Sequence, residues 1–256
     1  MDLLSEDLPK EAVPIDIRSH SLSFMTESDK ILKAKDVCMS FGGLQAIDSL
    51  SFDVQKGQIF SIIGPNGAGK TTAINLIAAI YKPTSGDIYF QDRPIANYKP
   101  FQVSQMGIAR TFQNIQIFKH MTVRENIMVG HHTRTQSGFL HCLLHTPLVW
   151  KEERVIKDAT NQLLDFFNLT SKADHLADSL PYGDQKRVEI ARALATEPEL
   201  LLLDEPVAGL NIHETQKISG LIQRIRDKGT TIILIEHDMN LVMRISDAII
   251  VLNYGK

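Results

Sequence analysis

Residues 64–71 have the types and the spacing that are needed to bind a phosphate chain. Their sequence, GPNGAGKT, matches the pattern G-x-x-x-x-G-K-[ST] at every specified position. Glycine lets backbone N–H groups approach phosphate oxygens, because a Cβ would block them, and it reaches the left-handed conformations that aim those groups inward. We expect Lys70 to bind the β- and γ-phosphates and the Thr71 hydroxyl to bind Mg²⁺. The residues expected to bind a nucleotide are Gly64, Pro65, Asn66, Gly67, Ala68, Gly69, Lys70, Thr71 and Thr72.

A second motif has the chemistry to hold a metal ion and to activate water. Residues 200–203 form an apolar run of strand length that ends in two carboxylates, Asp204 and Glu205. Ligands of open α/β sheets bind at the carboxyl ends of the strands, where Asp204 would lie. We expect Asp204 to hold the Mg²⁺ and Glu205 to polarise an attacking water molecule. The two motifs together predict a nucleotidase with a phosphate-binding loop.

The composition is that of a near-neutral globular protein with an acidic first segment. Of the 256 residues, 43% are apolar and 22% are charged, close to the averages for soluble proteins. The net charge is −3; residues 1–30 hold seven acidic and three basic side chains, so the other residues sum to +1. This balance argues against a nucleic-acid-binding protein that depends on bulk positive charge. No apolar run approaches the roughly 20 residues of a membrane span, and two cysteines cannot form a disulfide framework.

The hydrophobic pattern predicts strands that alternate with helices, which indicates an α/β fold with a mostly parallel sheet. The expected strands are Ile31–Met39, Ala46–Val54, Ile59–Ile63, Asp87–Phe90, Leu200–Leu203, Thr231–Ile235 and Ala248–Leu252. The expected helices are Thr71–Ile80, Thr122–Val129, Glu152–Asn168, Gly183–Ala195, Ile212–Arg226 and Met239–Ile245. We expect residues 1–29 to be a mobile acidic tail and residues 30–256 to form one domain, with a helical insert at about 113–180.

Further motifs distinguish the kind of nucleotidase. A small GTPase would carry an Asn-Lys-x-Asp motif, and the nearest string here, at residues 171–174, begins with Ser171. The other short motifs, in chain order, are residues 110–113 (RTFQ), 180–185 (LPYGDQ), 208–211 (AGLN) and 236–238 (EHD). This ordered set resembles the ATP-binding subunit of an ABC transporter, and the resemblance runs from about Ile31 to Lys256. It implies a P-loop ATPase core with an antiparallel β subdomain and an inserted helical subdomain, and ATP and Mg²⁺ as ligands.

The resemblance also implies a role for each motif. Phe41 is expected to stack on adenine, Gln113 to act in catalysis and to bind Mg²⁺, and His237 to act as the switch histidine. The signature motif, expected to contact the ATP of a partner subunit, comprises Leu180, Pro181, Tyr182, Gly183, Asp184 and Gln185. The expected D-loop comprises Ala208, Gly209, Leu210 and Asn211.

Within that superfamily, several strings are similar to those of bacterial branched-chain amino acid importers. They lie at residues 41–44, 109–114, 121–126, 182–187 and 235–239. The similarity is to the Liv-type subunit whose signature reads Tyr-Gly-Asp-Gln. It implies a peripheral protein at the cytoplasmic face of the bacterial inner membrane, which powers import through two integral-membrane permease subunits. It also implies a second ATPase subunit, an extracytoplasmic solute-binding protein that acts indirectly, and no nucleic acid.

Two features depart from the family pattern. Pro181 stands where most members have a serine whose hydroxyl contacts the γ-phosphate of the partner's ATP. The chain stops at Lys256, just after a predicted strand, where members continue further. We therefore expect a weakened signature and the lack of the usual C-terminal segment.

Other features have competing interpretations. A zinc site at residues 131–145 is weighed against a solvated loop; the potential ligands are His131, His132, His141, Cys142 and His145. We expect Cys38 to be a core residue rather than a redox group. The apolar side chains of Phe112, Ile115, Ile117 and Phe118 are expected to dock a membrane partner rather than to be plain core. Alternatives for the function are the same ATPase role for urea, amides or another small solute, and a soluble ABC ATPase without a transporter.

Overall fold

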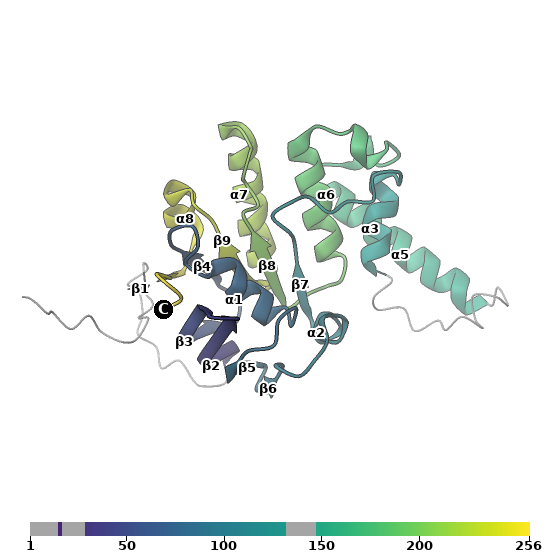
Figure 1. Ribbon diagram of the computed structural model, residues 1–256. Helices are drawn as coiled ribbons and strands as arrows, with labels where there is room; N and C mark the ends of the chain where they lie inside the picture. Colours follow the sequence, from purple (N-terminus) through teal and green to yellow (C-terminus); the bar gives the residue numbers. More distant parts are fainter. Residues whose placement is uncertain (1–14, 17–28, 132–146) are drawn as a thin grey trace, which may run out of the picture.

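The computed structural model describes residues 15–16, 29–131 and 147–256, and Figure 1 shows their arrangement. Its strands are β1 (Ile15–Asp16), β2 (Lys30–Phe41), β3 (Leu44–Gln55), β4 (Ile59–Ile63), β5 (Ser85–Phe90), β6 (Arg93–Pro94), β7 (Ile108–Arg110), β8 (Leu200–Asp204), β9 (Thr231–Ile235) and β10 (Ala248–Val251). Its helices are α1 (Lys70–Ile77), α2 (Pro100–Met106), α3 (Val123–His131), α5 (Pro147–Phe166), α6 (Tyr182–Leu194), α7 (Ile212–Asp227) and α8 (Met239–Ile245). Two short 3-10 helices are η3 (Thr170–Lys172) and η4 (Ala177–Ser179).

The central sheet has the strand order β1-β10-β4-β9-β8-β7, and its pairs from β10 to β7 are all parallel. Every residue of β8 and β9 is buried, as expected for strands of a parallel sheet covered on both faces. Alternate side chains enter different cores: Leu200 and Leu202 join the core beneath α1, whereas Leu201 and Leu203 join the core of α6, α7 and α8. This confirms the predicted α/β class.

A second sheet, with the order β3-β2-β5-β6, is antiparallel throughout. It packs against the core that contains α1, and the ring of Phe52 in β3 stacks on Phe60 of β4 at 5.3 Å. In Figure 1 it lies below the central sheet, as the predicted antiparallel β subdomain.

The helices α3, α5 and α6 form a group to the right of the central sheet in Figure 1. Contacts of α3 with both α5 and α6 hold the group together. The helix predicted at Glu152–Asn168 begins earlier, at Pro147, and ends at Phe166, before Asn168 adopts a left-handed φ of 54°. The helix predicted at Thr71–Ile80 ends at Ile77, because Ala79 has a φ of 54° and the chain turns.

Three further predictions concern Cys38, the suggested zinc cluster and the acidic tail. Cys38 is half-buried and bonded through Sγ to the Ser49 N–H at 3.2 Å, so its placement in the core was wrong. Of the five residues in the suggested zinc cluster, only His131 is described; the other four lie outside the described residues. The acidic-tail prediction stays a prediction, because only residues 15, 16 and 29 of it are described.

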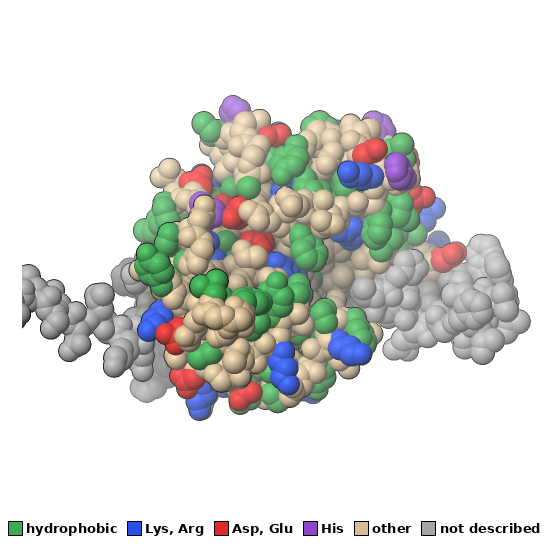
Figure 2. Space-filling view, in the orientation of Figure 1, with side chains coloured by type: hydrophobic (Ala, Val, Ile, Leu, Met, Phe, Trp, Pro, Cys, Tyr) green, Lys and Arg blue, Asp and Glu red, His purple; other side chains and the backbone are tan. Residues whose placement is uncertain are grey.

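Nothing in the described ranges would cross a membrane, since none of their helices is both long enough and apolar enough. Figure 2 shows basic and acidic side chains interspersed with apolar ones on the face drawn in Figure 1. That face therefore carries no extended patch of one charge.

Candidate functional site

The phosphate-binding loop, residues 64–69, connects β4 to α1 and packs tightly against its surroundings. Gly64 and Gly69 have φ values of 149° and 100°, in the region that favours glycine. A Cβ on Gly64 would lie 2.1 Å from the Leu252 carbonyl oxygen, and one on Gly69 would lie 2.5 Å from the Ala46 carbonyl oxygen. The loop is thus supported by β3 and by the chain after β10.

Lys70 is the first residue of α1 and is largely buried. Its Nζ donates hydrogen bonds to the carbonyl oxygens of Gly64 and Pro65, at 2.8 and 2.9 Å. Burial lowers the pKa of Lys70, and the carboxylates of Glu205 and Asp204 oppose that effect. The ammonium group therefore lies inside the loop and faces the acidic end of β8.

Asp204 ends β8 with only 1% of its surface exposed. Its Oδ2 accepts a hydrogen bond from Arg110 at 3.2 Å, and the same guanidinium donates to Asn75 of α1. Burial raises the pKa of Asp204, whereas the Arg110 charge lowers it. Within the described part of the chain, the buried Oδ1 of Asp204 has no hydrogen-bond partner. A buried, unpaired carboxylate oxygen is the type of atom that Mg²⁺ prefers, so this residue fits a metal ligand.

Glu205 follows Asp204 and is held by two other candidate residues. Gln113 Nε2 donates to its Oε2 at 3.1 Å, and His237 Nε2 lies 2.7 Å from its Oε1. The strand register explains why Glu205 and His237 are close: Asp204 pairs with Ile235 across β8 and β9, so the two strands end together. Three of the residues predicted for catalysis are therefore assembled at one sheet edge.

Two charged residues of this region were missed in the sequence. Arg110 binds Asp204, and the buried Glu236 accepts from the N–H groups of Val207 and His237, at 3.0 and 3.1 Å. Burial raises the pKa of Glu236. The signal in the sequence was, in each case, a charged residue directly at the end of an apolar strand. The neighbouring residues do not show which groups that charge contacts.

The predicted signature residues begin α6. Pro181 occupies the N-cap position with a φ of −54°, and the buried carboxylate of Asp184 pairs with Lys172 and Arg187. Gln185 Nε2 donates to the Leu180 carbonyl oxygen at 2.8 Å. Figure 1 shows α6 among the helices on the right and α1 beneath the central sheet, so the two motifs stand apart within one chain.

The predicted D-loop connects Glu205 to α7. Its last residue, Asn211, caps α7 by accepting from Glu214 N–H at 3.0 Å, while Glu214 Oε2 accepts from Asn211 N–H. A Cβ on Gly209 would lie 3.5 Å from the exposed Tyr182 ring. The D-loop and the start of the signature helix are therefore neighbours.

The predicted adenine-stacking residue, Phe41, ends β2 and is partly exposed. Its ring meets that of Tyr81 edge to face at 5.1 Å. The pair presents aromatic surface to solvent, and adenine stacking stays a prediction.

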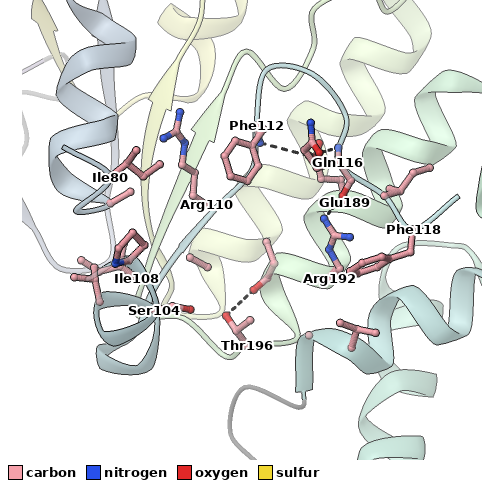
Figure 3. A pocket seen from close by; sticks show the side chains of 18 residues that line it. Ile80, Ser104, Ile108, Arg110, Phe112, Gln116, Phe118, Glu189, Arg192 and Thr196 are labelled. Atoms are coloured by element: carbon pink, nitrogen blue, oxygen red, sulfur yellow. Dashed lines mark hydrogen bonds between the residues drawn. The ribbon is translucent and has the colours of Figure 1, made fainter. Parts of the chain in front are cut away.

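A cavity of about 440 Å³ lies between α2, β7, α3 and α6, next to residues 111–118, here called the glutamine loop (Figure 3). Phe112, Ile117 and Phe118 line it, and the side chains of Phe112 and Phe118 are partly exposed. Ile115 is half-buried and does not line it. The guanidinium of Arg110 lies 5.0 Å from the Phe112 ring centre. Arg110 also lines the cavity and binds Asp204, so one side chain connects the cavity to that carboxylate.

The comparison with known proteins identifies the family. A family model described as ABC transporter matches residues 47–208, which include the phosphate-binding loop, the signature and Asp204. The chain belongs to the ABC transporter family. This confirms the resemblance that the motifs indicated, and as an ABC-type ATPase the chain binds and hydrolyses nucleotide.

Individual ABC proteins resemble the chain over most of its length. The high-affinity branched-chain amino acid transport ATP-binding protein LivG of Salmonella typhimurium is 44% identical over 89% of this chain and 90% of its own. BraF of Pseudomonas aeruginosa, described in the same words, is 43% identical over the same shares. The crystal structure of the ADP conformation of an ABC transporter cassette has a TM-score of 0.77 at 36% identity, covering 88% of both chains. A dimeric bacterial ABC transporter cassette has a TM-score of 0.74 at 26% identity, covering 88% of this chain and 95% of that one.

Replacing Glu205 by glutamine should leave ATP binding intact and slow hydrolysis by about 10²- to 10⁴-fold, because an amide cannot accept a proton from water. Initial rates of phosphate release and size exclusion with ATP and Mg²⁺ measure the effect, and an accumulated ATP-bound dimer is expected. Glu153→Gln, at an exposed position of α5, is the matched control. A Glu205→Gln variant that hydrolyses ATP at the normal rate would move the base to another residue.

Replacing Glu236 by glutamine tests the buried carboxylate. Because burial raises its pKa above the ordinary 4.5, the carboxyl stabilises the fold most below that value and loses this contribution as pH rises through the raised pKa. The amide does not titrate and, like the protonated carboxyl, has one carbonyl oxygen for the two N–H groups, so we expect the wild type and the variant to have similar stability at low pH. Urea unfolding between about pH 5 and pH 8 should show the wild type losing stability relative to Glu236→Gln as pH rises. A wild type that gains stability relative to the variant over this range would contradict the assignment.

Proposed function

We propose that this chain is the ATP-hydrolysing subunit of an importer of branched-chain amino acids. The supporting comparison is the 44% identity to a LivG protein over nearly the whole chain. The observation that carries the chemistry is Glu205, held between Gln113 and His237 beside the buried Asp204.

The side chains have distinct tasks in hydrolysis. Lys70 and the N–H groups of residues 64 and 66–72 bind the phosphates, and Phe41 stacks on adenine. The Thr71 hydroxyl, Asp204 and Gln113 would hold Mg²⁺, which would neutralise charge on the β- and γ-phosphates when bound. Glu205 orients water and accepts its proton, and His237 fixes the Glu205 carboxylate through their 2.7 Å contact.

Two ATPase subunits face each other head to tail, with each ATP between the phosphate-binding loop of one and the signature of the other. The separation of α1 and α6 in Figure 1 supports this arrangement, because one chain cannot close both motifs on one nucleotide. A dimeric cassette is among the solved relatives. The exposed Tyr182 and the D-loop beside it would belong to the contact between subunits.

The cavity beside the glutamine loop is the proposed docking place of a membrane permease. Its exposed aromatic rings, Phe112 and Phe118, offer apolar surface to a cytoplasmic segment of that partner. The complex would contain two permease subunits and lie at the cytoplasmic face of the bacterial inner membrane. An extracytoplasmic solute-binding protein would choose the solute, and no nucleic acid takes part.

Uptake of labelled leucine tests the proposal in cells that lack the gene for this chain. The wild-type gene should restore uptake, and the Glu205→Gln gene should not, because hydrolysis drives the transport step. Uptake of labelled urea by the same strains is the matched control and should not change. Normal leucine uptake in the deleted strain, or restored urea uptake instead, would contradict the amino acid assignment.

Pro181 predicts that the two ATP sites of a pair of different ATPase subunits hydrolyse ATP at unequal rates. It removes a hydroxyl donor from the signature, and a lost hydrogen bond to a charged group is worth about 1.5–3 kcal/mol, or roughly 10- to 100-fold in rate if it acts in the transition state. We expect low ATPase activity from the purified chain alone and a rise of that order when a partner ATPase with a serine signature is added. Pro181→Ser should raise the activity of the isolated chain. Full activity of the isolated chain, unchanged by the partner or by this substitution, would refute the unequal sites.

A further inference from the structure

One face of α6 holds the main chain of the glutamine loop. Lys186 Nζ donates to the Gln113 carbonyl oxygen at 3.1 Å. Glu189 Oε1 accepts from the N–H groups of Phe112 and Gln116, at 3.4 and 3.0 Å, and Arg192 donates to the Gln116 carbonyl oxygen. The three side chains stand three residues apart, so they share one side of the helix. In Figure 3, dashed lines join Glu189 to both Phe112 and Gln116.

The hydrogen bonds between α6 and the glutamine loop are costly to break, because the side chains that make them are buried. Lys186 is 1% exposed and Glu189 is 2% exposed. Residues 111–118 have no helix or strand, so their backbone groups depend on partners from elsewhere. A buried donor or acceptor that loses its partner carries the full cost of desolvation. Separating the glutamine loop from α6 would therefore destabilise the protein.

The loop in turn sets the position of a candidate catalytic side chain. The main chain of Gln113 is held by Lys186, and its side chain donates to Glu205. The charge of Lys186 also faces several carboxylates, those of Glu189, Glu236, Asp204 and Glu205, which favour its ionised form against burial. Through the Lys186 ammonium group, α6 thus interacts electrostatically with the carboxylates of the hydrolytic region.

The same helix begins with the signature. Pro181 caps α6, and Lys186 and Glu189 lie within its first three turns. The side chains that hold the glutamine loop therefore belong to the same helix as the signature.

We propose that Lys186 and Glu189 are positioning residues for Gln113: through the backbone of the glutamine loop they hold its side chain at Glu205. The inference rests on the proposed role of Gln113.

A double-mutant cycle tests this proposal in the complex that copurifies with the full chain. Lys186→Met should lower kcat by about 10- to 100-fold and leave the equilibrium affinity for ATP unchanged, while Lys186→Arg should recover part of kcat. In a Gln113→Ala background, Lys186→Met should cost little more, because the side chain through which it acts is gone. Lys157→Met, at an exposed position of α5, is the matched control and should leave kcat unchanged.

Glu189→Met, which removes the Oε1 atom that accepts from both N–H groups, gives a second cycle if Lys186→Met does not fold. The same non-additivity with Gln113→Ala is expected. Equal fold-losses in the wild-type and Gln113→Ala backgrounds, or an unchanged kcat, would overturn the proposal while leaving the proposed function intact. A wild-type complex without ATPase activity would overturn the proposed function and this inference with it.

Discussion

The burial of the Asp204 carboxylate constrains the arrangement of the whole catalytic region. The residue ends an apolar strand with almost no exposed surface, so its charge needs a partner inside the protein. Arg110 of β7 supplies that partner and also binds Asn75 of α1. Removing one member of a buried ion pair typically costs about 3–5 kcal/mol. The helix after the phosphate-binding loop, the strand before the glutamine loop and β8 are therefore tied together at one guanidinium.

That junction also connects the hydrolytic site to the surface. Arg110 contacts the ring of Phe112, which lines the cavity proposed for a permease segment. On the other side of the loop, Gln113 reaches Glu205, and α6 holds the loop from beneath. A partner that moves Phe112 thus acts on groups one or two contacts from the reacting carboxylates. This short route gives a physical basis for exchanging energy between hydrolysis and transport.

The sequence by itself determined the nucleotide chemistry and most of the framework. The phosphate-binding loop needs glycines at fixed positions, and the buried strands are continuous apolar runs, so both leave a local signal. The strand at Thr231–Ile235 and the helix at Met239–Ile245 have the bounds that were predicted. By contrast, α2 and β7 were not predicted, because elements of seven and three residues have too few positions for a periodic pattern.

Only the tertiary structure decided which charged residues support the site. Lys186 and Glu189 bind backbone groups of the glutamine loop up to 77 residues away, and Arg110 and Asp204 are 94 residues apart in the sequence. Their local sequence is that of an ordinary amphipathic helix or strand end. Partners at such separations meet because parallel strands end at one edge and α6 packs beside it. A hydrogen bond to a main-chain atom can be made with any residue type, so no pattern of side chains in the sequence records it.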